Sequence, residues 1–209
     1  MVFHGKSVAE TMKQWEETNA AVASTRGGEL LVTKRFTFSS MWGVVGVLAV
    51  VGNALRRLLP IALEPFKQGN FTPLLWAEYV GFALFMAYSE GFKGFQKKFS
   101  PLVIRRAYTL GPNSPFLHKL FAPIYSMGFF HSSRKRKIIS WSLTLGVAVL
   151  IKLVKTLSYP YRSIIDAGVV VGLSWGSLAT AAIYVKALMT GRVPDVDPAF
   201  PEVGEKKKA

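Results

Sequence analysis

The sequence predicts an all-α membrane protein in which a bundle of four transmembrane helices crosses the bilayer. Three observations lead to this prediction. Four stretches of about 20 mostly apolar residues have the length that a helix needs to cross a hydrocarbon core roughly 30 Å thick. Half of the 209 residues are hydrophobic, and yet the net charge is +14, a combination that an apolar part embedded in lipid explains. The positive charges also gather between the apolar stretches rather than within them.

The predicted spans differ in the charges that they contain. The first has none and is followed by Arg56 and Arg57, whereas the second contains one acid, Glu78. The third carries Lys152 and Lys155 near its end. Backbone N–H and C=O groups in lipid need hydrogen-bond partners from the protein, which a helix supplies within its own segment. Apolar and polar residues do not alternate with period two, so helices are favoured over a β-barrel. The predicted spans cover residues 36–55, 71–89, 138–157 and 167–185, within a transmembrane domain over residues 36–190.

The distribution of Lys and Arg predicts which segments share a side of the membrane. With four spans, residues 1–35, the basic loop 90–137 and the chain after the last span lie on one side and hold 20 of the 26 positive charges. The two remaining loops hold six. Because cytoplasmic loops are enriched in Lys and Arg, we expect both termini on the cytoplasmic side, or on the equivalent stromal or matrix side.

The two ends of the chain are expected to lie outside the bundle. Residues 1–35 are polar and lack the apolar core of a signal peptide, so the first span is expected to act as the insertion signal. Residues 191–209 contain three prolines and no apolar periodicity, which predicts a disordered basic tail. Lys206 and Lys207 match the dilysine pattern that returns membrane proteins to the endoplasmic reticulum; a simple solvated tail is the alternative.

The basic loop begins with a segment of amphipathic character. Its aromatic residues recur at helical spacing while its lysines take other faces, which predicts a short helix in the headgroup plane that Pro101 ends. Anionic lipids would be its partners. Residues 116–130 are expected to form an interfacial or re-entrant stretch, because a fifth span would separate the termini. The predicted lipid contacts are Phe92, Lys93, Phe95, Lys97, Lys98 and Phe99.

Small residues at four-residue spacing predict close helix packing. Gly168, Gly172 and Gly176 fall on one face of the last span, and Gly43 and Gly46 form a looser pair in the first span. Small residues let helix backbones approach closely in lipid. The pattern suits packing within the chain, and a homodimer or a partner subunit is the other interpretation.

Glu78 is the residue most typical of a functional site, because an ionised carboxylate within a span costs on the order of 3 kcal/mol. We expect it to form a charge pair with Lys152 or Arg56, which lie toward the same side of the membrane. A structural ion pair is the first interpretation, and a proton, ion or substrate site is the second.

Other chemistry has little support in the sequence. There is no cysteine, the three histidines lack metal-ligand spacing, and no catalytic set or phosphate-binding loop is present, so no catalytic residue, metal or cofactor is predicted. The charge pattern does not suggest nucleic-acid binding. Asp166, at the start of the last span, is interpreted as a helix cap.

Two segments, "FMAYSEGFKGFQKKFSP" (85–101) and "DAGVVVGLSWG" (166–176), are similar to parts of small polytopic membrane proteins of bacteria and algae. The resemblance spans most of the chain after Phe36 and implies an all-helical membrane protein. It implies no activity and no functional residues, because those proteins are uncharacterised.

The leading functional hypothesis is a non-enzymatic membrane subunit, scaffold or assembly factor, since packing motifs and anchors are visible while catalytic sets are not. The alternative is a small transporter or channel component that uses Glu78 with Arg56 and Lys152. A lipid-modifying enzyme is disfavoured, because it would require acids or histidines clustered near one interface.

Overall fold

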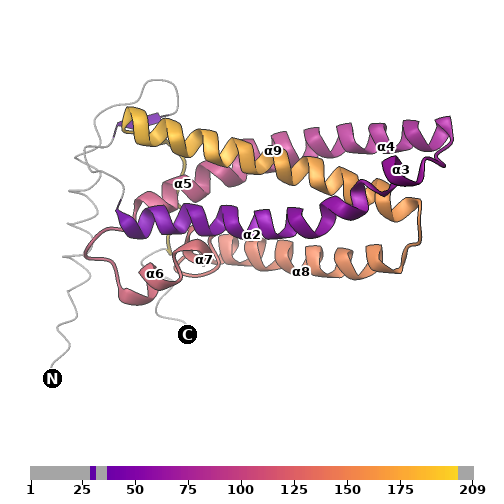
Figure 1. The fold of residues 1–209 in the computed structure, drawn as a ribbon. Coiled ribbons are helices and arrows are strands. Elements are labelled where there is room, and N and C mark those ends of the chain that lie inside the picture. Colours follow the sequence, from indigo (N-terminus) through magenta and orange to yellow (C-terminus); the bar gives the residue numbers. More distant parts are fainter. Residues whose placement is uncertain (1–28, 32–36, 202–209) are drawn as a thin grey trace.

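The protein is mostly helical in the computed structural model, which describes residues 29–31 and 37–201. In chain order the helices are α2 (Phe38–Ala62), α3 (Glu64–Gln68), α4 (Pro73–Met86), the π-helix η1 (Ala87–Phe99), α5 (Ser100–Tyr108), α6 (Phe116–Leu120), α7 (Ala122–Ser126), α8 (Arg134–Thr156) and α9 (Tyr161–Thr190). Long helices run lengthwise, the short helices α6 and α7 lie at one end of the bundle, and α3 lies at the other (Figure 1).

Three helical stretches of the described chain are long and apolar enough to cross a membrane. They are Phe38–Gln68, which joins α2 and α3, Arg134–Thr156 and Tyr161–Thr190. The first, third and fourth predicted spans therefore coincide with apolar helices of sufficient length. The predicted second span corresponds to α4, which contains 14 residues and continues into η1.

Local sequence explains where these helices begin and end. The side chains of Thr37, Thr72 and Ser133 accept hydrogen bonds from the first turns of α2, α4 and α8, respectively. Such side chains satisfy amides that have no partner within the helix. The helix α9 ends at Thr190 and is followed by Gly191, whose φ of 65° is accessible to glycine at little cost.

The helical run through residues 73–108 corrects two predictions about the basic loop. Residues 90–100 do not form a separate helix, because they continue α4 and pack against α9, and their placement in the headgroup plane stays a prediction. Pro101 does not end the helix. The Ser100 amide donates to the Phe95 carbonyl five residues back, and Pro101 falls at the start of renewed α-helix, where a missing amide hydrogen costs least.

The helix α9 is the central element of the bundle. It packs against α2, α4 and η1, whereas α8 packs on it much less (Figure 1). Residues 116–130 form α6 and α7, and α7 packs against α2 and α5. One core cluster joins α2, α5, α9 and residue 193. It contains Val44, Ile104, Ala107, Tyr184, Ala187 and Val193.

The predicted disordered tail is wrong for residues 191–201. Strand β2 (Arg192–Pro194) pairs antiparallel with β1 (Glu29–Leu31), with Leu30 opposite Val193. The Val193 side chain is fully buried, and the Ala199 carbonyl accepts from the Ser133 amide over 2.8 Å. Backbone hydrogen bonds and one buried apolar side chain thus hold residues 191–201 in place, although their sequence has no apolar periodicity. Residues 202–209, with the dilysine pattern, and most of residues 1–35 lie outside the described residues.

Candidate functional site

The charge pair predicted from the sequence does not form in this structure. In the described part of the chain, no ion pair within 4.0 Å joins Glu78 to Lys152 or Arg56, and all three residues are exposed. The reason is the packing order: α4, which carries Glu78, packs on α9, whereas Lys152 lies on α8.

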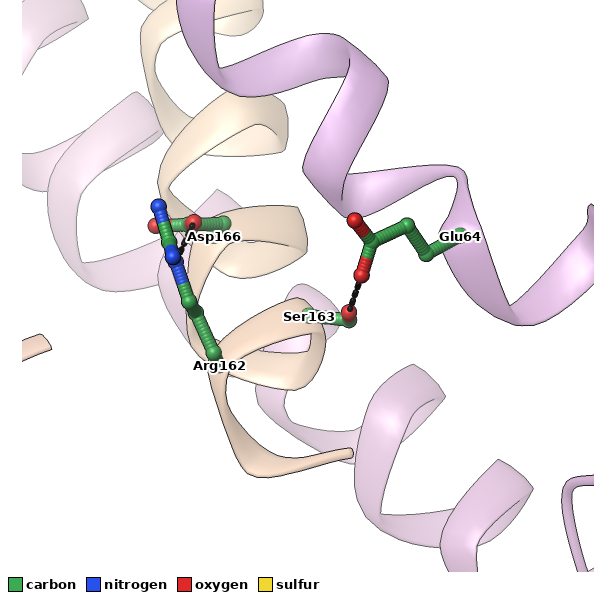
Figure 2. Close-up of polar contacts among 4 residues, drawn as sticks. All are labelled: Glu64, Arg162, Ser163 and Asp166. Atoms are coloured by element: carbon green, nitrogen blue, oxygen red, sulfur yellow. Dashed lines mark hydrogen bonds and ion pairs between the residues drawn. The ribbon is translucent and has the colours of Figure 1, made fainter. Parts of the chain in front are cut away.

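A different polar cluster lies where α3 begins beside the first turns of α9 (Figure 2). The Ser163 hydroxyl donates to Glu64 Oε2 over 3.2 Å. One turn further on, Arg162 Nε lies 3.7 Å from Asp166 Oδ2. Two separate contacts, one from Ser163 to Glu64 and one from Arg162 to Asp166, thus lie near the ends of two helices that are long and apolar enough to cross a membrane.

Burial distinguishes this cluster from an ordinary surface ion pair. Ser163 is fully buried and Asp166 is 5% exposed, so water contributes little to the solvation of that carboxylate. A buried carboxylate is costly unless it is paired or hydrogen-bonded, and Arg162 supplies the opposite charge. The arrangement can hold a fixed charge or a proton within the helical region.

The position of Asp166 also corrects its interpretation as a helix cap. The helix α9 begins at Tyr161 and has no side-chain cap, so Asp166 lies in its second turn. The spacing of Arg162 and Asp166, four residues apart, was the signal available in the sequence. No pattern in the sequence indicates that Glu64, on α3, lies against Ser163.

A buried arginine organises the opposite end of the bundle. Arg106 is fully buried and donates to the backbone carbonyls of Tyr125, Pro198, Phe130 and His131 over 2.6–3.1 Å. Its guanidinium also lies 4.5 Å from the centroid of the Tyr125 ring. Burial lowers the pKa of Arg106 to about 10, so the side chain stays charged at neutral pH.

The histidines of this end lie closer together than the sequence suggested. The rings of His118 and His131 have centroids 4.8 Å apart, and His118 also stacks on Tyr125. Burial lowers the pKa of His118, and the nearby positive charge of Arg106 lowers it further. The described residues contain no group of three or more His, Cys, Asp or Glu able to hold a metal ion.

The predicted packing glycines contact neighbouring helices of the same chain. A Cβ atom at Gly168 would lie 2.5 Å from Phe82, one at Gly172 would lie 3.3 Å from Glu90, and one at Gly176 would lie 2.3 Å from Phe95. The last span therefore presents its small residues to α4 and η1. On α2, Cβ atoms at Gly43 and Gly46 would meet Ser126 and Pro123 of α7, at 2.8 and 2.2 Å.

The predicted lipid-contact residues divide between two environments. Phe95 lies against Gly176, its ring is 5.1 Å from that of Phe99, and the side chain is partly buried, so it packs on α9 while its lipid contact stays a prediction. The exposed lysines Lys93 and Lys97 lie over the rings of Tyr88 and Phe92. Lys98 is exposed as well.

Comparison with known protein families, curated proteins and solved structures finds no match for this chain. A function for this chain is therefore inferred from its fold and from the two polar clusters. Together they define a class of chain: long apolar helices compatible with a membrane protein, with buried charged groups near both ends of the bundle.

Proposed function

We propose that this protein is a multi-pass integral membrane protein that serves as a non-enzymatic subunit, scaffold or assembly factor of a membrane complex. In this proposal the helical run 73–108 supplies the fourth crossing through its apolar part near α4. The basic end of the bundle, with Lys97, Lys98 and the run Arg134–Lys137, would face the cytoplasm or its equivalent and meet anionic lipids.

The observation that carries the proposal is the exposure of α8. Its 23 residues end at Thr156, and every residue from 141 to 153 is exposed in the monomer. Large apolar side chains are involved, including Leu145 at 67% and Trp141 at 61%. Such a helix suits lipid, and the small residues Ser142 and Gly146 on its surface suit close contact with a helix of another subunit or a second copy.

A second candidate is a transporter or channel component. The specific observation in its favour is the buried carboxylate of Asp166 beside Glu64, because ionisable groups inside membrane helices are a hallmark of ion and proton pathways. In this version Asp166 takes the role that the sequence analysis assigns to Glu78.

Gentle detergent purification separates the two candidates. We expect the wild-type chain to elute with a stoichiometric membrane partner or as a homodimer, and Gly146→Leu to elute without it. A Cβ atom at Gly146 meets nothing within 4 Å in the monomer, so the substitution leaves the chain's own packing intact. A monomer with no partner, together with proton or ion flux in proteoliposomes that Asp166→Asn abolishes, would favour transport instead.

A further inference from the structure

The loop between α3 and α4 contains a motif that the proposed function does not use. Residues 70–72 read Asn-Phe-Thr, which is an acceptor sequence for an N-linked oligosaccharide. The other asparagines of the chain, Asn19, Asn53 and Asn113, are not followed by this pattern. A glycan that such a motif directs can therefore be attached only at Asn70.

Asn70 is accessible in the folded chain. It is exposed and lies in a segment without regular secondary structure, because α3 ends at Gln68 and α4 begins at Pro73. Its side-chain oxygen accepts a hydrogen bond from the Tyr159 hydroxyl. Its side-chain nitrogen, the atom that carries an N-linked glycan, donates to Gln68 Oε1 over 3.5 Å, a long and exposed contact that leaves this nitrogen open to modification.

The position of the loop in the bundle places it on the side of the membrane where glycans are added. It follows α3, at the end of the bundle opposite α6 and α7 (Figure 1). In the proposed orientation the end with α6 and α7 faces the cytoplasm, so the loop faces the opposite compartment. In a cell with an endoplasmic reticulum, that compartment is the lumen.

The run formed by α4 and η1 lies parallel to α9, which gives a scale of depth for the loop. A Cβ atom at Gly168 would lie 2.5 Å from Phe82, and one at Gly176 would lie 2.3 Å from Phe95, so the contacts advance together along both helices. The depth of a residue in α4 can therefore be read from the residue of α9 beside it. Phe82 has the depth of Gly168.

On this scale Asn70 lies outside the hydrocarbon core. The uncharged stretch of α9 begins after Asp166, which precedes the level of Phe82 by two residues, or about 3 Å. The helix α4 begins at Pro73, nine residues or about 14 Å before Phe82. Its first turns thus extend about 10 Å past the level of Asp166. Asn70 precedes these turns, so it lies in water with room for a soluble enzyme domain.

We propose that Asn70 is an N-glycosylation site, modified when the chain is inserted through a membrane whose far side holds a lipid-linked oligosaccharide. The donor is an oligosaccharide on a polyprenyl diphosphate, which a membrane-bound transferase uses. The Asn70 nitrogen forms a bond to C1 of the first sugar and loses a proton. The bond between C1 and the diphosphate oxygen breaks, and polyprenyl diphosphate leaves. The inference rests on the proposed membrane orientation.

Translation of the full chain with pancreatic rough microsomes tests the site. We expect wild type to give a slower gel band that endoglycosidase H removes, and Asn70→Gln to lose that band completely. Thr72→Asp keeps an oxygen that can cap α4 but removes the motif, so it should lose the band too, whereas Thr72→Ser should keep it. Pro73 restricts the backbone of Thr72, so Pro73→Ala should raise the modified fraction. A wild-type chain without the band, or a band in Asn70→Gln, would overturn the proposal.

Added acceptors separate failure of the site from failure of the orientation. In the Asn70→Gln chain, one Asn-Ser-Thr acceptor in a Gly/Ser spacer is inserted after Gly69, and another is placed after Ala209 in a second version. We expect a glycan on the first and none on the second. A modified loop acceptor with an unmodified Asn70 in wild type would reject the site and leave the orientation standing. A glycan after Ala209 would reject the orientation, and with it the site, whereas a chain that alkaline carbonate extracts from the microsomes would reject the membrane function itself.

Discussion

At the scale of single residues, Arg106 shows how a charge counted with a basic loop becomes part of a core. In the sequence Arg106 counts among the positive charges expected on the cytoplasmic side, because no neighbouring residue marks it as buried. The structure supplies four backbone carbonyls, two from the turn at residues 130–131, one from α7 and one from the tail. The forked guanidinium can satisfy several acceptors at once, which an ammonium cannot do.

We expect Arg106→Ala to lower the free energy of unfolding by about 3 kcal/mol or more, because it leaves several buried carbonyls without a donor. Arg106→Lys keeps the charge but offers one nitrogen, so it should fall between wild type and Arg106→Ala. The measurements are thermal unfolding in detergent and proteolysis of the 192–201 segment. Lys137→Ala, at an exposed position, is the control. A tail that stays protected in Arg106→Ala would contradict the role.

The polar site shows the limit of prediction at the same scale. The cost of burying a carboxylate correctly drew attention to acids in the spans, but Glu78 is exposed, whereas Asp166, interpreted as a cap, is the buried one. The difference depends on where α9 begins, and element boundaries are the least certain part of a sequence-based prediction. The contact of Ser163 with Glu64 depends on tertiary packing alone.

At the scale of elements, the apolar stretches were readable because hydrophobic length is a strong signal. The continuation of α4 through η1 was not, because lysines in Ala87–Phe99 suggested a loop at the membrane surface. Its other side packs on α9 through Phe95 and Gly91, with a Cβ at Gly91 only 2.8 Å from Trp175. Trp175 also donates to Gln96 over 2.7 Å. Tertiary contacts with α9 therefore determine the structure of this segment.

We predict that Gly176→Leu destabilises the bundle, while Gly81→Leu does not. A Cβ at Gly176 would lie 2.3 Å from Phe95 Cγ, whereas one at Gly81 meets nothing within 4 Å. Overpacking of this kind costs about 1–3 kcal/mol, which lowers the melting temperature by about 2–4 °C per kcal/mol in a chain of this size. Melting in detergent checks it, and Phe95→Ala should restore part of the loss. Equal melting of the two leucine variants would show that α9 does not pack on η1 in this way.

At the scale of the whole molecule, the helix ends that lie together in the bundle are those whose segments carry most of the Lys and Arg residues. The start of α2, the helices α5 to α7, the start of α8 and the end of α9 lie at one end of the bundle, and α3 lies at the other (Figure 1). The basic run Arg134–Lys137 belongs to the first end, and Lys67 to the second. The charge count predicts the same grouping of segments, because Lys and Arg are retained on one side of a membrane, and the side that each end of the bundle faces stays a prediction.

This grouping makes a prediction about labelling in intact cells. Lys137→Cys and Arg192→Cys should both resist a membrane-impermeant maleimide, whereas Lys67→Cys should react, because all three positions are exposed and only the side differs. After permeabilisation all three should react, which controls for steric access. Reaction at Lys137→Cys and Arg192→Cys but not at Lys67→Cys would be compatible with the four proposed crossings and would invert their proposed orientation. A split between Lys137→Cys and Arg192→Cys would instead break the pairing of α8 and α9 as two successive crossings.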